Sequence, residues 1–216
     1  MPVPRSGLKW AVLAGALAAC ASHPETPRPA ASPAEPATHQ HAAPAAHDHA
    51  SGMAATAGAG FTVADVRFMQ HMIGHHAQAL RMVAMLPGHG ASEDVVRMAQ
   101  KIGISQRDEI ALMRSWLEER RQTVPDEAQP HAMMMPGMLT AEQLAQLDAA
   151  RGREFDRLFL TFMTRHHEGA LQMVRELFQA PGAGQDPDLF RFVTDVDADQ
   201  RDEILMMERL LHSQQD

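Results

Sequence analysis

The chain has 216 residues, of which 45% are hydrophobic, and it contains 13 histidines, 16 methionines and one cysteine. Its formal net charge is −8 at pH 7, which argues against nucleic acid as a partner, because phosphate binding requires a basic face. A single cysteine excludes an internal disulfide and a thiolate metal cluster. A metal ion would therefore be bound by histidine, methionine and carboxylate side chains.

The first nineteen residues resemble an export signal. Arg5 and Lys9 give a positive start, and the apolar run over 10–19 is too short for a stable membrane span. The run ends in LAAC, similar to a bacterial lipobox, which predicts cleavage of residues 1–19 and a lipid on Cys20 as the membrane anchor. The alternative is an ordinary signal peptide with an incidental cysteine. We expect a cell-envelope protein that faces the periplasm if the bacterium has an outer membrane.

Residues 20–60 are rich in Ala, Pro, Ser, Gly and His and contain few large apolar side chains. Such a composition cannot bury enough surface to offset chain entropy, so it predicts a disordered tether. Four of its histidines form HQH and HDH triplets, which could bind Cu(II) or Zn(II) or be incidental: His39, His41, His47 and His49.

The segment 61–122 predicts a helical hairpin at the start of the folded domain, which spans 61–216. Thr62 opens a capping box for a helix that reaches about Leu86. Ser92 is expected to cap a second helix that runs to about Arg121.

The segment 140–213 predicts a second hairpin, after a Pro- and Met-rich connector over 123–139. Thr140 opens another capping box, and Gly152 is expected to interrupt the helical stretch that reaches about Gln179. Asp186 precedes the proline that begins the last helix. No alternating β pattern occurs, so two amphipathic hairpins predict an all-α four-helix bundle.

A histidine pair occurs twice in matching surroundings. The first copy reads FMQHMIGHHAQALRMVAML and the second LFLTFMTRHHEGALQMVRELF, and each is followed about thirty residues later by QRDEI. The pairs interrupt an otherwise apolar helix face, where imidazole, the commonest neutral metal ligand, has no packing reason to be. Together with nearby thioethers, imidazole favours copper over zinc and iron.

Spacing along the two helices selects the candidate ligands. Three pairs lie four residues apart, which places them on one helix face about 5–6 Å from each other. Phe162 stands where the second copy would match the first histidine of QHMIGHH, so a site shared by the halves should be asymmetric. The predicted ligands are His71, Met72, His75, His76, Met163, His166 and His167.

The repeated pentapeptide supplies supporting groups. At 1.5 Å per residue, Glu109 should return to the level of His71 and Gln106 to that of His75. The same count places Gln200 and Glu203 near the second pair. A carboxylate that accepts one imidazole N–H turns the other ring nitrogen toward a metal. The alternative is a buried His–Glu/Gln network that only sets helix register.

The connector contains a methionine cluster that helix packing does not explain. Clustered thioethers suit Cu(I), and a hydrophobic plug over the end of the bundle is the alternative. Its members are Met133, Met134, Met135 and Met138. Motifs of ferritin-type di-iron sites, HExxH proteases, serine hydrolases and phosphate loops are absent from the sequence.

Four segments together resemble the bacterial domain-of-unknown-function family 305. They are the paired-histidine helix, QRDEI, MPGMLTAEQL and EFDRLFLTFMTRHHEGALQMV. The resemblance covers about residues 61–212 and implies a ferritin-like helical bundle. Some similar exported proteins are associated with copper binding and copper tolerance through His and Met. Carried over to this chain, that ligand role falls on the predicted ligands named above.

The sequence therefore favours a lipid-anchored envelope protein that buffers or delivers copper by coordination and release. Three alternatives stay open. The first is binding of zinc or storage of divalent metals by the histidine tail. The second is a metal-dependent oxidoreductase with copper or iron in the bundle. The third is a structural envelope protein whose buried histidines and glutamates specify the fold. No protein partner is indicated.

Overall fold

The computed structural model describes residues 55–126 and 135–214. In these ranges it contains five helices and no β-strand, which confirms the predicted all-α class: α1 (Val63–Ala84), α2 (Glu93–Glu119), α3 (Ala141–Ala149), α4 (Gly152–Gln179) and α5 (Pro187–Ser213). The predicted signal peptide, Cys20, and the tether with its four histidines lie outside the described residues.

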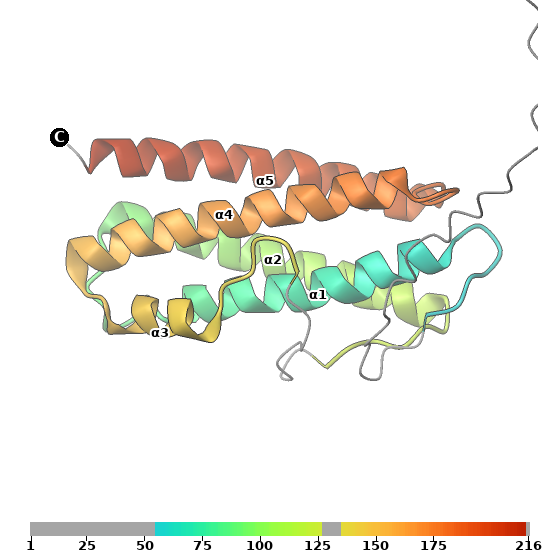
Figure 1. Cartoon of the computed structure of the whole chain (residues 1–216), viewed down its shortest axis with the longest axis horizontal. Coiled ribbons are helices and arrows are strands. Elements are labelled where there is room, and N and C mark those ends of the chain that lie inside the picture. The colour runs from blue at the N-terminus through green and yellow to red at the C-terminus, as the bar shows by residue number, and fades with distance from the viewer. Residues whose placement is uncertain (1–54, 127–134, 215–216) are drawn as a thin grey trace, which may run out of the picture. The chain divides into compact units, whose positions relative to one another are not determined.

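The four long helices form two hairpins that pack against each other. Helices α1 and α2 make the first hairpin, and α4 and α5 make the second. The hairpins meet through α1 against α4 and α2 against α5, while short α3 lies against α4 (Figure 1). The result is the expected four-helix bundle, with α3 added in the connection between the hairpins.

Local sequence signals account for most helix ends. The predicted capping boxes at Thr62 and Thr140 are both present, and Gly152, with φ of 56°, separates α3 from α4. Ser92 occupies the N-cap of α2, but its side chain makes no capping bond. Its backbone N–H donates instead to the Asp156 carboxylate on α4. The start of α2 is thus held by a contact between hairpins, and the expected side-chain cap does not form.

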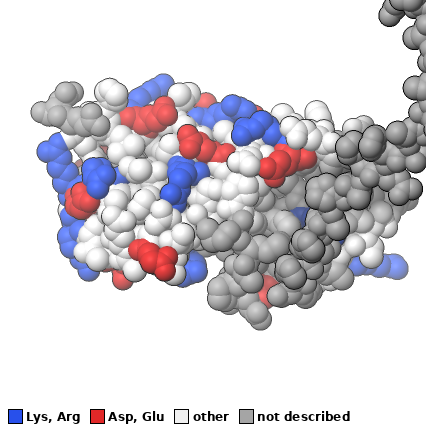
Figure 2. Space-filling model, viewed as in Figure 1, with Lys and Arg blue, Asp and Glu red and all other residues white. Residues whose placement is uncertain are grey.

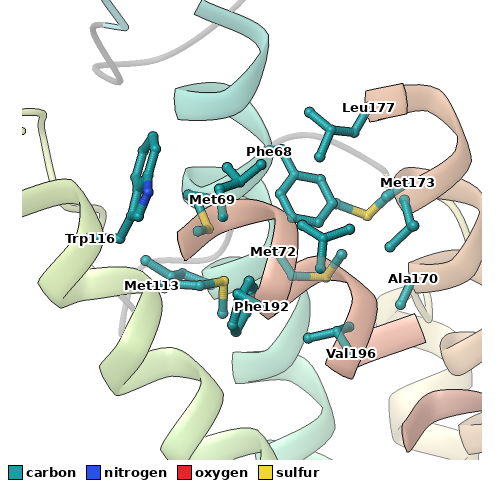
Figure 3. Packing of buried hydrophobic residues seen from close by; sticks show 14 of the residues in the cluster. Phe68, Met69, Met72, Met113, Trp116, Ala170, Met173, Leu177, Phe192 and Val196 are labelled. Atoms are coloured by element: carbon teal, nitrogen blue, oxygen red, sulfur yellow. The ribbon is translucent and has the colours of Figure 1, made fainter. Parts of the chain in front are cut away.

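Two hydrophobic cores fill the bundle, one toward each end. The first core takes its side chains from the start of α1, the end of α2, the end of α4 and the start of α5, and Figure 3 shows its packing. The second core lies around the opposite ends of the same helices and includes Phe155 and Phe159. Between the two cores, all four long helices contribute buried histidines, glutamines or glutamates.

Acidic and basic side chains are interspersed over the face shown in Figure 2. Several pair locally within one helix, as Arg157 does with Glu154 and Arg201 with Asp197; exposed pairs of this kind contribute little to stability. None of the described helices combines the length and apolar character needed to cross a membrane.

Candidate metal centre

A buried polar layer separates the two hydrophobic cores. Each of the four long helices contributes two residues to it, and most of the eight side chains are at most 1% exposed. Helices α1 and α4 supply the two histidine pairs, and α2 and α5 supply a glutamine and a glutamate from each copy of QRDEI. The histidine layer, as we name it, consists of His75, His76, Gln106, Glu109, His166, His167, Gln200 and Glu203.

The first histidine of each pair faces the other hairpin. The rings of His75 and His166 lie in contact, with centroids 3.8 Å apart and planes inclined by 36°. Within each pair the rings are farther apart, at 6.4 Å on α1 and 6.2 Å on α4. Successive helical residues point about 100° apart, so one histidine of a pair faces across the hairpin interface while the other faces its own hairpin partner.

The second histidine of each pair bonds the glutamate of its own hairpin. His76 Nε2 lies 2.5 Å from Glu109 Oε2, and His167 Nε2 lies 2.9 Å from Glu203 Oε2. Glu109 also accepts a hydrogen bond from Ser105. Burial is the largest influence on the pKa of Glu109 and raises it, but the bonds from His76 and Ser105 and the electrostatic influence of His76 and His167 outweigh burial and lower that pKa overall. Glu109 is therefore a carboxylate at neutral pH.

The predicted position of Glu109 along the bundle axis was wrong by more than one helical turn. The rise count places it opposite His71, but the structure pairs it with His76. At 1.5 Å per residue, Glu109 lies about 24 Å from the start of α2, whereas His76 lies about 12 Å from the end of α1. The connection over 85–92 thus continues along the bundle before α2 begins, which a count from helix ends cannot reveal.

Three imidazoles share the same hydrogen-bond pattern. The Nε2 atoms of His76 and His167 face carboxylates, and that of His75 lies 3.0 Å from the Pro136 carbonyl oxygen. These oxygens accept, so Nε2 carries the hydrogen in each ring. The opposite nitrogen, Nδ1, is buried without a hydrogen-bond partner in all three. A bare, buried Nδ1 is the form in which imidazole binds a metal ion.

His166 differs from the other three. The His75 backbone raises the pKa of His166, although burial and the neighbouring imidazoles lower it more. Neither ring nitrogen of His166 has a partner at hydrogen-bond geometry. The Gln106 amide and one oxygen each of Gln200 and Glu203 are also buried without partners. Buried polar groups are nearly always paired in proteins, so this concentration of unpaired donors and acceptors makes the layer the candidate site for a ligand.

Burial keeps the imidazoles at the hairpin interface neutral. Burial, followed by the influence of His76, lowers the pKa of His75 from 6.5 to about 3. Burial and then the neighbouring imidazoles, His75 first, hold the pKa of His166 well below 6.5. Because only neutral imidazole ligates a metal ion, both rings are in the ligating state at physiological pH.

The layer is not a closed coordination sphere as it stands. Among residues 55–126 and 135–214, no three His, Cys, Asp or Glu side chains converge on one metal position. The contact between the rings of His75 and His166 leaves no space for an ion between them. Binding an ion with both rings therefore requires at least one ring to rotate.

The remaining predicted ligands lie around the layer. Met72 is fully buried in the first core and Met163 in the second, so one thioether lies on each side of the layer (Figure 3 shows Met72). His71 is half-buried on α1. In the connector, Met135 packs in the first core and Met138 against it, so packing accounts for these two. Met133 and Met134 lie outside the described residues.

A surface groove reaches the layer between α2 and α5. Its volume is about 440 Å³, and Glu109 forms part of its lining together with four further carboxylates: Glu119, Asp188, Asp195 and Asp199. Burial, followed by the charges of Glu109 and Glu203, raises the pKa of Asp199. Arg191 also lines the groove, but carboxylates predominate along it from the surface to the His76–Glu109 pair.

Sequence reasoning missed the acceptor for His75. The Pro136 carbonyl comes from the connector, and a backbone oxygen leaves no residue-type signal. Gln78, which bonds the same segment at Leu139, was also missed, because a glutamine that follows a histidine pair on a helix resembles an ordinary polar position. The sequence signal for this contact was a pair of glycines, Gly137 in the connector and Gly169 on α4, where a Cβ would collide with the backbone of the other segment.

Comparisons with known proteins agree with the fold. A chain from Deinococcus radiodurans, a DUF305 fragment, is 31% identical, with a TM-score of 0.62 over 71% of this chain and 98% of the other. A candidate secreted DUF305 protein from Streptomyces coelicolor is 27% identical, with a TM-score of 0.62 over 70% and 93% of the two chains.

A third similar structure is that of CopM in a Cu(I)-bound form. It is 25% identical, with a TM-score of 0.55 over 69% of this chain and 96% of CopM; CopM structures with Cu(II) and with silver are also similar in fold. No curated protein sequence matches the chain. The family model described as a domain of unknown function, DUF305, matches residues 65–211. The chain belongs to the DUF305 family.

Proposed function

We propose that this protein binds copper in the histidine layer and acts as a copper buffer or chaperone of the cell envelope. The observation that carries the proposal is the shared state of three imidazoles, those of His75, His76 and His167. Each gives its Nε2–H to an oxygen and keeps a buried Nδ1 without a partner. An acceptor behind the ring is the usual companion of a metal-ligating histidine. Nothing in the proposal requires a substrate; the ion is taken up and released.

Copper is favoured over zinc and iron by the chemistry of the surrounding groups. Met72 and Met163 offer one thioether on each side of the layer, and thioethers prefer Cu(I), whereas imidazole accepts either oxidation state of copper. CopM, a protein of similar fold, has been solved with Cu(I) and with Cu(II). Of the connector methionines, Met133 and Met134 would act together with the tail histidines as auxiliary ligands that collect the ion, because Met135 and Met138 are used in packing.

The proposal includes export and a lipid anchor on Cys20. The charged start, the short apolar run and LAAC support it, and one similar family member is a candidate secreted protein. Fractionation of cells that express the wild-type chain and Cys20→Ala tests this part. We expect the wild type in the membrane fraction and the variant outside it; equal distribution of the two would refute the lipid anchor.

The metal site is tested by anaerobic titration of the mature protein with Cu(I) and, separately, with Cu(II) and Zn(II). In one variant, His75, His76, His166 and His167 are replaced by Gln, which can still donate to the glutamates. In the matched variant, the four tail histidines are replaced by Ala. We expect tight copper binding in the wild type and the tail variant and its loss in the layer variant, with helical content retained.

Two results would contradict the copper proposal. Binding that follows the tail histidines alone would make the bundle a scaffold for a metal-binding tail. No binding by any version, with a large loss of stability in the layer variant, would favour the structural role of the His–Glu network.

A further inference from the structure

A five-residue segment of the connector crosses α1 and α4 beside the histidine layer. We name this segment, Met135–Leu139, the strap; it enters α3 through the capping box at Thr140, and Figure 1 shows it passing over the helices. Gln78 on α1 bonds it twice, since its Nε2 donates to the Leu139 carbonyl at 3.0 Å and its Oε1 accepts from the Leu139 N–H at 2.7 Å. The strap is therefore attached to α1 by specific bonds.

Two glycines let the strap lie directly on α4. A Cβ on Gly169 would collide with the Pro136 carbonyl group and with Gly137. A Cβ on Gly137 would collide with the backbone of Arg165 and His166, and its φ of 77° also disfavours any other residue. Backbone thus meets backbone at the turn that carries the second histidine pair. An alanine at either position would move the strap away.

The strap contacts a ring of the histidine layer. Its Pro136 carbonyl oxygen lies 3.0 Å from His75 Nε2. A carbonyl can only accept, so it selects the ring form with hydrogen on Nε2 and leaves Nδ1 bare inside the layer. His76 and His167 obtain the same state from glutamates of their own hairpins. His75 alone among these three depends on the connector.

We propose that the strap positions His75 for metal binding and closes the layer on the α1–α4 side, with Gln78 and Gly169 as the positioning residues that hold it there. The proposal deepens the copper function and rests on it for the role of the ion. His75 can rotate away from His166 only by stretching or releasing its bond to Pro136. When His75 is the ring that rotates, seating of the strap and access of a metal ion to the interface rings are therefore linked.

The positioning is tested without metal by ¹⁵N NMR of the histidine rings at neutral pH in the presence of chelator. We expect His75 in the Nε2–H form in the wild type. In Gly169→Ala and in Gln78→Ala, we expect a mixture of the two neutral forms at His75, with His76 and His167 unchanged as internal references. Matched controls are Gly103→Ala, a helical glycine on α2, and Gln172→Ala, an exposed glutamine on α4.

Gln78→Ala keeps the test valid if Gly169→Ala does not fold, because it removes two hydrogen bonds without adding an atom. An unchanged Nε2–H form of His75 in the folded strap variants would overturn the positioning role. So would a wild-type His75 with its hydrogen on Nδ1. These outcomes do not depend on copper, so they are distinct from failure of the proposed function.

Access is tested by the rate at which a Cu(I) chelator removes copper from the loaded full-length protein. We expect release to be about tenfold faster in Gly169→Ala and Gln78→Ala than in the two controls, in line with the usual effect of removing a group behind a ligand, at unchanged stoichiometry. Equal release rates in strap and control variants would overturn the closing role. Failure of the wild type to load copper would overturn the proposed function and with it the closing role, while the NMR result still decides the positioning.

Discussion

The rings of His75 and His166 lie in contact across the interface between the two hairpins, with centroids 3.8 Å apart. They are the first members of the two repeated histidine pairs, so equivalent residues meet where the hairpins meet. Each second member bonds the glutamate of its own hairpin. The repeat in the sequence has thus become an approximate two-fold arrangement, and the strap on His75 breaks its symmetry.

His166→Leu and His167→Leu should have different consequences for the metal-free protein. The substitution at His166 replaces a buried ring that has no hydrogen-bond partner, so we expect the free energy of unfolding to change by less than about 1 kcal/mol. The substitution at His167 leaves Glu203 buried without its partner, which should cost about 2–3 kcal/mol. Urea denaturation with chelator present measures both. Equal losses would mean that His166 has a structural partner of its own.

Glu203→Gln should weaken copper binding without removing the ligand. The carboxylate, 1% exposed, accepts from His167 Nε2, and loss of such an acceptor usually lowers metal affinity about 10–100-fold. Competition with a chromophoric chelator measures the change. Glu208→Gln, an exposed substitution on the same helix, is the matched control and should bind like the wild type. An unchanged copper affinity in Glu203→Gln would show that Glu203 does not support the metal site.

The role of the Met72 and Met163 thioethers in copper binding can be tested by volume-conserving substitution. Met72→Leu with Met163→Leu should change stability by less than about 1.5 kcal/mol at each site yet lower the affinity for Cu(I) about tenfold or more, corresponding to at least about 1.4 kcal/mol. The control is Met98→Leu with Met113→Leu, two buried methionines of α2. Similar Cu(I) affinities in both double variants would assign Met72 and Met163 to packing alone.

Asp186 should give the bundle part of its acid sensitivity. The carboxylate caps α5, and it accepts from Trp116 Nε1 at 3.1 Å and from Arg120 at 2.7 Å. Burial is the largest influence on the pKa of Asp186 and raises it, but the bonds from Leu189, Arg120 and Trp116 together lower that pKa below 3.8. The stabilisation is complete above this ordinary value and is lost as the pH falls through the lowered one.

Asp186→Asn tests this dependence. At pH 7 we expect a loss of about 2–3 kcal/mol in the free energy of unfolding, because the charge-assisted bonds and part of the cap are removed. The difference from the wild type should shrink as the pH falls below 3.8. Denaturation curves at neutral pH and at several acidic pH values measure it. A difference that stays constant over this range would show that the charge of Asp186 is not involved.

The helices were predictable because their signals are local. Capping boxes at Thr62 and Thr140, the break at Gly152 and the proline at the start of α5 act within one turn of chain, and the structure contains each of them. Ser92 illustrates the limit, because its N–H bonds Asp156 on another helix. The side-chain cap that short-range reasoning expected is not formed, and a contact between distant segments holds the start of α2.

The site was predictable in its residue types and in the pairing of Glu203 with the second histidine pair, but not in the pairing of Glu109. The repeated motifs placed imidazoles opposite carboxylates, yet the rise count joined Glu109 to His71, and the structure joins it to His76. The level at which α2 begins depends on how far the connection 85–92 continues beyond α1. That length is a property of loop packing, and helical periodicity contains no information about it.

By itself, the sequence determined that two similar hairpins form one bundle and that histidines, glutamines and glutamates interrupt its apolar faces. These features follow from periodicity, caps and an internal repeat, which act over short stretches of chain. Only the tertiary structure decided that His75 faces His166, that a polar layer divides the core in two, and that a connector carbonyl holds His75. Those relationships depend on how helices and loops distant in the chain pack together, because only packing brings their atoms within contact distance.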